Sequence, residues 1–227
     1  QFNENYKDEE DREILVYSSA LKLFSNQNIL MEKDSSYQLK FAKETKGSII
    51  LNNTLYEKII EEINQLSNYE YGCVEQTSSK LKALLCKQKI NGVMGLKENL
   101  TPAIYNLINK LSNYQNIQGT WGWWAKESPN WRMTIYAMDV LFAANNIGYS
   151  NNSFASARDA INANFYELNI SDQLYALYVF QKMNFVDQDM KDMFEKIQLN
   201  DLKTIDKIYY HKISEGLGRK VNPNDFY

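Results

Sequence analysis

The residues best suited to chemistry in this sequence are Cys73 and Gln76, a thiol and a side-chain amide three positions apart. At the start of a helix, such a pair can close a small ring in which the cysteine sulfur displaces ammonia from the glutamine. Cysteine is needed because its sulfur is both a strong nucleophile and a good leaving group. Taken alone, the pair favours a plainer interpretation, in which Cys73 is a small buried hydrophobic residue.

The immediate surroundings of the pair suit the same ring chemistry. Gly72 would allow the backbone to turn tightly and to approach other groups closely. A helix that begins here would favour the thiolate, because the N-terminal end of a helix carries a partial positive charge. The same helix end would stabilise the oxyanion that forms when an amine attacks the acyl group.

Composition limits the classes of protein to consider. The chain has 227 residues, enough for one large domain or for one domain with a small appendage. Three prolines and nine glycines favour long helices over a turn-dense sandwich. The net charge is −3 without a cluster of lysine and arginine, which argues against nucleic-acid binding. Neither metal-ligand spacing nor a glycine-rich phosphate loop is visible in the sequence, so we expect no metal and no cofactor.

The chain has two regions of different periodicity, and the pair lies in the second of them. Residues 1–52 carry strand signals, whereas residues 53–227 have the apolar period of amphipathic helices. We therefore expect a mainly α protein that is preceded by a short β-rich segment. The strand signals are a β-prone segment at Ile14–Ser18, apolar alternation at Tyr37, Leu39 and Phe41, and an apolar run at Ser48–Leu51.

Capping signals divide the helical region into about eight helices. Thr54 with Glu57 forms a capping-box pattern. Thr101-Pro102 and Ser128-Pro129 are typical of helix starts, and Gly92 and Gly148 are expected to end helices. Further amphipathic stretches cover residues 153–167, 171–184, 187–198 and 201–215.

One internal echo indicates how these helices are organised. Ile63–Tyr69 reads INQLSNY and Ile108–Tyr114 reads INKLSNY, at a spacing of 45 residues. Such a period fits one helical hairpin per repeat, so we expect an array of hairpins, closed or open.

Two blocks of sequence carry a resemblance to a known family. The segment Tyr71–Thr77 reads YGCVEQT, and its Gly-Cys-x-Glu-Gln core resembles the thioester signature of the α2-macroglobulin and complement family. The context is similar to the bacterial branch of that family. A second block, Gly119–Trp124 (GTWGWW), is followed by Trp131 and Thr134–Asp139, and it resembles a tryptophan-rich block of the bacterial proteins. Both blocks stand in the order of the family.

The resemblance implies a fold. It implies that residues 53–227 are a thioester domain, built as an α/α toroid of helical hairpins, with residues 1–52 as the β region that leads into it. A complete toroid of the family has about six hairpins and this chain supplies roughly four, so the toroid is expected to be partial.

The resemblance also implies a function, that of an endopeptidase inhibitor rather than a turnover enzyme. A protease would cut a bait segment elsewhere in the parent protein, and a lysine amine of that protease would then attack the Cys73–Gln76 thioester. In this reading Gly72 and Glu75 support the motif, and Tyr71, Trp121, Trp123 and Trp124 shield the bond from water. The tryptophans have two other readings, as core residues or as a platform that stacks on sugar.

Two further residues are assigned plainer roles. Cys86 lies 13 positions after Cys73, too far along one helix for a disulfide, and we expect it to be a buried core thiol. His211, the only histidine, lies in an ordinary amphipathic stretch. Some vertebrate relatives use a downstream histidine for transfer to hydroxyls, and this chain has none at the comparable place. Direct attack by amines is therefore expected.

Other functions stay open at this point. The chain could be a helical-repeat binding module with an inert Cys73, a toroid enzyme acting on glycans, or a thioester adhesin acting on host surfaces. It begins at Gln1 rather than at a methionine, so we expect an excerpt of a longer protein or a processed product. No stretch of the sequence approaches a membrane span. For the parent protein we expect a role in bacterial defence at an extracytoplasmic location, either the periplasm or the cell surface, with or without a lipid anchor. Its expected partners are target proteases and other domains of the same protein.

Overall fold

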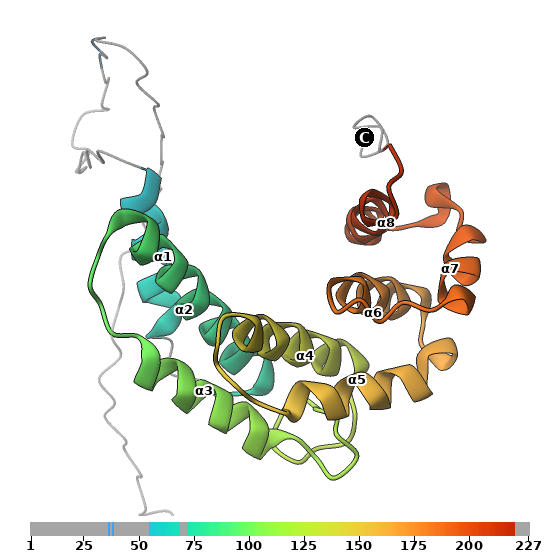
Figure 1. The fold of residues 1–227 in the computed structure, drawn as a ribbon, viewed down its shortest axis with the longest axis horizontal. Helices are drawn as coiled ribbons and strands as arrows, with labels where there is room; N and C mark the ends of the chain where they lie inside the picture. The colour runs from blue at the N-terminus through green and yellow to red at the C-terminus, as the bar shows by residue number, and fades with distance from the viewer. Residues whose placement is uncertain (1–35, 37, 39–54, 69–71, 221–227) are drawn as a thin grey trace, which may run out of the picture. The chain divides into compact units, whose positions relative to one another are not determined.

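A computed structural model describes residues 36, 38, 55–68 and 72–220 (Figure 1). The chain divides into two compact units, residues 1–49 and residues 50–227. The helices of the described residues all lie in the second unit. The expected strand segments and the capping-box residue Thr54 lie outside the described residues, as does Tyr71.

The described part of the chain is helical, with eight α-helices and two short 3-10 helices and without a β-strand. This confirms the prediction of a mainly α protein. None of the helices in this part combines the length and apolarity that crossing a bilayer requires. The helices are α1 (Leu55–Ser67), α2 (Val74–Met94), α3 (Thr101–Tyr114), α4 (Trp131–Asn146), α5 (Ser153–Ala163), η1 (Phe165–Glu167), α6 (Ile170–Lys182), α7 (Gln188–Glu195), η2 (Leu199–Asp201) and α8 (Thr204–Gly216).

The helices pack as a succession of hairpins. Helix α2 packs against α4, α4 against α6, and α6 against α8, so these four helices form one continuous row. Helix α3 packs against α2 and α5 packs against α4, and Figure 1 shows α3, α5 and α7 along the other side of the row. Every second helix therefore belongs to the row, as expected for an array of hairpins.

The sequence echo falls at matching places in this array. Ile63 lies near the end of α1 and Ile108 lies near the end of α3, and both side chains are buried. Both helices pack against α2. The two copies of the echo therefore occupy comparable places, each in the C-terminal half of a helix that packs against α2.

Local chemistry explains where the helices begin and end. Helix α4 begins at Trp131, later than Ser128-Pro129 suggested, because the Oδ1 atom of Asn130 accepts a hydrogen bond from the N–H of Met133 and caps the helix. Helix α2 continues past Gly92 to Met94 and ends at Gly95, whose φ of +69° is left-handed. The N–H of Leu96 then bonds to the carbonyl of Asn91, which completes the helix end.

The core runs between the row and the helices beside it. Each fully buried leucine, isoleucine or phenylalanine contributes about 1.5–3 kcal/mol relative to an exposed one. The largest fully buried side chains are Trp121, Phe165, Phe180, Phe194, Leu81, Ile104, Leu111, Ile135, Met138, Leu141, Ile161 and Leu174.

Cys86 does not belong to this core, and the prediction of a buried core thiol is wrong. Its side chain is exposed, as are Lys82, Lys89 and Val93 on the same helix. These four positions follow the helical period and form the solvent face of α2. Leu81, Leu84 and Leu85, which form the buried face, suggested burial for their neighbour because an apolar run does not show which face each residue takes.

Candidate thioester site

Cys73 and Gln76 lie at the start of α2, Cys73 directly before the helix and Gln76 in its first turn. Cys73 is the residue that precedes the helix, with extended backbone angles of φ −67° and ψ 170°, and its carbonyl accepts the N–H of Thr77 at 2.9 Å. Its side chain makes no capping hydrogen bond, so the sulfur is not used to hold the helix end. Cys73 is a free cysteine with only 6% of its surface exposed.

The side chain of Gln76 has an unusual environment. Its Oε1 atom is buried, and none of the described residues donates a hydrogen bond to it. A buried amide oxygen without a donor costs about 1–3 kcal/mol. The buried oxygen therefore destabilises the fold if the side chain of Gln76 is an ordinary amide.

Gly72 leaves room for a neighbouring lysine. A Cβ atom added to this residue would lie 2.6 Å from Lys110 Nζ and 3.7 Å from the hydroxyl of Tyr114. Gly72 is not among the residues with a positive φ, so its backbone angles do not demand glycine. The close approach of the Lys110 amine is the structural consequence of the missing side chain.

Glu75 accepts a hydrogen bond from Ser79, which is in turn bonded to a tyrosine, and sequence reasoning missed both hydroxyl groups. Ser79 Oγ donates to Glu75 Oε1 at 3.2 Å, and the same Oγ lies 2.9 Å from the hydroxyl of Tyr136 on α4. Burial raises the pKa of Tyr136, and the charges of Glu75 and Asp139 raise it further, against the lowering effect of its bond to Ser79. Ser79 follows Glu75 by one helical turn, which is the signal that could have found it.

A cavity of about 250 Å³ opens beside Gln76. It is the place where a small molecule or a side chain would reach this turn of α2. Its lining residues are Leu66 from α1 and Glu75, Gln76, Ser79 and Lys80 from α2.

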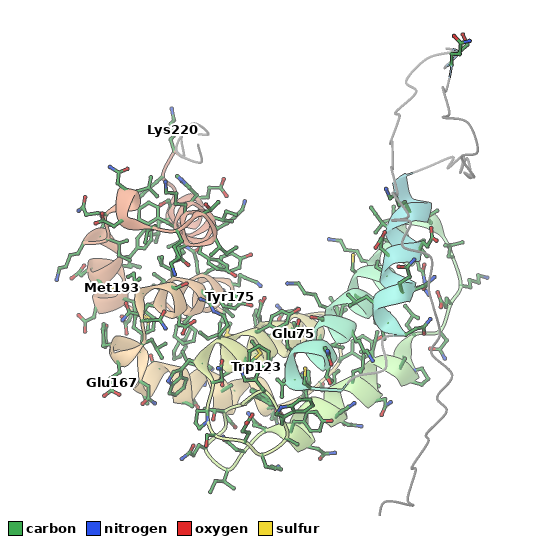
Figure 2. All side chains as sticks on the ribbon, turned by 180° about the vertical axis from the view of Figure 1, so that it is seen from behind. Glu75, Trp123, Glu167, Tyr175, Met193 and Lys220 are labelled. Carbon is green, nitrogen blue, oxygen red and sulfur yellow. The ribbon has the colours of Figure 1, made fainter. Side chains whose placement is uncertain are left out.

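The tryptophan-rich block meets the site through its backbone. The N–H of Val74, the first residue of α2, donates to the carbonyl of Trp123 at 2.9 Å. Figure 2 shows Glu75 and Trp123 at this end of α2, whereas Glu167 and Met193 lie away from both. The two blocks that were recognised in the sequence are therefore joined in the fold.

The individual tryptophans occupy different environments. Trp121 is fully buried, and its indole N–H donates to the carbonyl of Leu111 at 2.8 Å, as a core residue would. Trp123 and Trp124 are 48% and 60% exposed. His211 is buried on α8 and does not line the cavity beside Gln76.

These features define a class of protein, an array of helical hairpins with a Cys-x-x-Gln pair at the start of one of the helices in its continuous row. No family model matches the chain. In sequence, the chain is 32% identical over 90 residues to an α2-macroglobulin of Thermotoga maritima, a match that covers 39% of this chain and 6% of that protein. The chain thus spans only a small part of the length of the curated relative that it matches.

Solved structures of α2-macroglobulins also align with this chain. A crystal structure of native Escherichia coli α2-macroglobulin, spanning domain MG7 to the C-terminus, aligns with a TM-score of 0.55 at 20% identity, over 72% of this chain and 31% of that one. A crystal structure of Salmonella α2-macroglobulin reacted with methylamine aligns with a TM-score of 0.53 at 20% identity, over 70% of this chain and 12% of that one. The predicted resemblance to the bacterial-type α2-macroglobulin family is therefore confirmed.

Proposed function

We propose that this chain contains the thioester region of an α2-macroglobulin-like protease inhibitor. In the bond-forming step, Cys73 Sγ attacks the Gln76 side-chain carbonyl carbon and ammonia leaves. In the trapping step, a lysine amine of a captured protease attacks the same carbon. The carbon–sulfur bond breaks, the electron pair goes to sulfur, and an amide bond tethers the protease. Each molecule reacts once, so the protein is an inhibitor and not an enzyme.

The observation that carries this proposal is the burial of both reacting groups at the start of α2. The cysteine is buried and its sulfur does not cap the helix. The glutamine oxygen is buried without a donor among the described residues. A thioester carbonyl is a weaker hydrogen-bond acceptor than an amide carbonyl, so this environment suits the thioester better than the free glutamine.

The proposal extends to the architecture of the helical unit. The row α2, α4, α6 and α8, with helices on its other side, supports a partial α/α toroid. In this proposal residues 53–227 form the thioester domain and residues 1–52 lead into it. Trp123 and Trp124, exposed beside the site, together with Tyr71 and Trp121, would shield the bond within the parent protein.

The wider setting follows from the resemblance. We infer that the parent protein acts outside the cytoplasm of a bacterium as part of its defence, and that any lipid anchor belongs to the parent protein. Its partners would be target proteases and its own remaining domains. The resemblance to bacterial α2-macroglobulins supports these assignments.

The mass of the intact chain before and after treatment with methylamine tests the proposal. We expect freshly prepared protein to be lighter than its sequence by one ammonia. Methylamine should then add one molecule to residue 76 and release a thiol at Cys73. A Cys73→Ser variant should show neither change.

Two outcomes would contradict the proposal. An unshifted mass, with Cys73 freely alkylated in fresh native protein, would indicate a binding module with an inert cysteine. A mass lighter by one ammonia that methylamine leaves unchanged would indicate a different internal link, such as an amide between Gln76 and Lys80, one helical turn away.

A further inference from the structure

The cavity beside Gln76 combines an apolar wall with a carboxylate. Its volume of about 250 Å³ is sufficient for several water-sized groups. Leu66 provides an apolar wall from α1, and the carboxylate of Glu75 lies next to Gln76 in the same lining. A lysine side chain has matching parts, namely an apolar stem and a charged end.

The hydroxyl groups around Glu75 form a chain with one direction. A carboxylate only accepts hydrogen bonds, so Ser79 must donate its single hydroxyl proton to Glu75 Oε1. The bond of 2.9 Å between Ser79 and Tyr136 must therefore be donated by the tyrosine. Burial raises the pKa of Tyr136, which keeps its phenol protonated and able to donate.

The hydroxyl groups of Ser79 and Tyr136 fix the position of the Glu75 carboxylate but leave acceptor positions on its oxygens open. A carboxylate offers about four acceptor positions on two oxygens, and the bond to Ser79 takes one of them. Ser79 comes from the same helix as Glu75, whereas Tyr136 comes from α4. The carboxylate is therefore positioned by the packing of two neighbouring helices of the row.

Other charged groups lie near this arrangement. Lys80 lines the same cavity, and Lys82 Nζ lies 5.5 Å from the centre of the Tyr136 ring. The charge of Asp139, on the same helix as Tyr136, raises the pKa of that tyrosine. Of the five residues that line the cavity, Glu75 is the one with a negative charge, so it is the group that attracts a cation.

We propose that this cavity, hereafter the amine pocket (Leu66, Glu75, Gln76, Ser79 and Lys80), receives the protonated primary amine that attacks the thioester. Glu75 removes one proton from the ammonium group, and Ser79 and Tyr136 are positioning residues for Glu75. This inference depends on the proposed thioester function and adds the residues that receive the amine and take up its proton.

An ammonium group that becomes an amide nitrogen must lose two protons. The ammonium nitrogen loses one proton to Glu75, and its freed electron pair attacks the acyl carbon at residue 76. The carbon–sulfur bond breaks and its electron pair goes to Cys73 Sγ. The nitrogen loses a second proton, which converts the thiolate to a thiol, and Glu75 releases its proton to water.

Two probe amines of different charge test this role on the full chain. Methylamine is protonated at neutral pH, as a lysine side chain is, whereas hydroxylamine is uncharged. The rate at which each amine is incorporated is measured by intact mass for protein whose thioester has first been verified by mass. We expect Glu75→Gln to slow methylamine about 100-fold, within the range of general acid–base effects. Hydroxylamine should change about twofold or less, because it has no proton to lose before attack.

Variants of the two positioning residues test the role of Glu75 even if the Glu75→Gln protein does not form the thioester. Ser79→Ala and Tyr136→Phe should slow methylamine by about 3–10-fold, the size of one hydrogen bond, with little effect on hydroxylamine. Ser79→Thr, which keeps the hydroxyl, should restore the rate. Tyr166→Phe, which removes an exposed phenol on η1, is the matched control and should match the wild-type protein.

The outcomes separate this inference from the function on which it depends. Unchanged methylamine rates in Ser79→Ala and Tyr136→Phe, with an intact thioester, overturn the amine pocket alone. Equal slowing of both amines also overturns it, because that pattern indicates a general distortion of the site. Wild-type protein without a thioester overturns the proposed function itself.

Discussion

The N–H of Val74 donates a hydrogen bond of 2.9 Å to the carbonyl of Trp123, and this bond joins the first turn of α2 to the loop that precedes α4. The first N–H groups of a helix have no partner within the helix, so one of them is free for this contact. The loop is itself fixed by Trp121, whose carbonyl accepts the N–H of Asn130 at 2.9 Å and the hydroxyl of Thr134 at 3.0 Å. The position of the site therefore depends on the backbone of a buried tryptophan.

Alanine at Trp121 and at Trp123 should separate the contribution of a buried side chain from that of a backbone carbonyl. We expect Trp121→Ala to lower the free energy of unfolding by about 3–5 kcal/mol, because it leaves a cavity in the core. Trp123→Ala should change it by about 0.5 kcal/mol or less, since the side chain is exposed and the backbone carbonyl remains. Urea denaturation followed by circular dichroism measures both. Equal losses would show that the exposed ring also stabilises the fold.

Two glycines should respond in opposite directions to alanine. At Gly122 a Cβ atom would lie 2.6 Å from the backbone carbonyl of Ser128, and that backbone cannot move aside easily. Gly122→Ala should therefore destabilise the protein by about 1–3 kcal/mol. At Gly92, inside α2, a Cβ atom would meet nothing within 4 Å. Gly92→Ala should stabilise by about 0.5–1 kcal/mol, and thermal unfolding of the pair would reveal any failure of this ordering.

The ion pair between α4 and α6 should matter more than an exposed one. Arg132 Nε lies 2.8 Å from the buried carboxylate of Asp172, and Arg132 Nη2 donates to Ser171 Oγ at 2.7 Å. Arg132→Met should lower the free energy of unfolding by about 1–3 kcal/mol, because it leaves the aspartate without its charged partner. Lys212→Met, which breaks the exposed pair with Glu215, is the control and should change it by about 0.5 kcal/mol or less. Similar values from denaturant unfolding would argue against a special role for Arg132.

Alkaline pH should destabilise the fold through buried tyrosines. Burial is the main cause that raises the pKa values of Tyr136, Tyr175 and Tyr209 above the ordinary value. A raised pKa in the folded state gives stability that is complete below the unfolded value, about pH 10, and is lost as pH rises above it. The free energy of unfolding, measured across this range, should therefore fall with rising pH. Tyr175→Phe should make the fall less steep, and an unchanged slope would contradict this origin.

The helical class and the ends of most helices could be predicted because they depend on local patterns. Apolar residues at helical spacing revealed the helices, and Thr101-Pro102 lies at the start of α3 as expected. The start of α4 was predicted too early, since Asn130 competes with Ser128 as a cap and the sequence does not show which side chain will reach the free N–H groups. The exposed position of Cys86 was missed for a similar reason, because an apolar neighbourhood does not fix a face.

The site was predictable only along one segment of chain. Cys73, Glu75 and Gln76 are close in sequence, so their common turn could be inferred. The bond between Ser79 and Tyr136 spans 57 positions, and the one between Val74 and Trp123 uses a backbone carbonyl that has no sequence signature. Contacts of both kinds arise from how helices pack. Although Trp121, Trp123 and Trp124 are nearly adjacent, they differ in exposure because the loop turns between them.

The exposure of Cys86 gives the molecule an internal standard. A thiol reagent applied under native conditions should label this sulfur at once in every molecule, whatever the condition of Cys73. One equivalent of reagent consumed per chain would then mark the unreacted form, and a second equivalent would mark opening of the ring. The same accessible sulfur allows two chains to be cross-linked by oxidation. A preparation that is to remain monomeric therefore needs a reducing agent without a thiol, because a thiol would open the thioester by exchange.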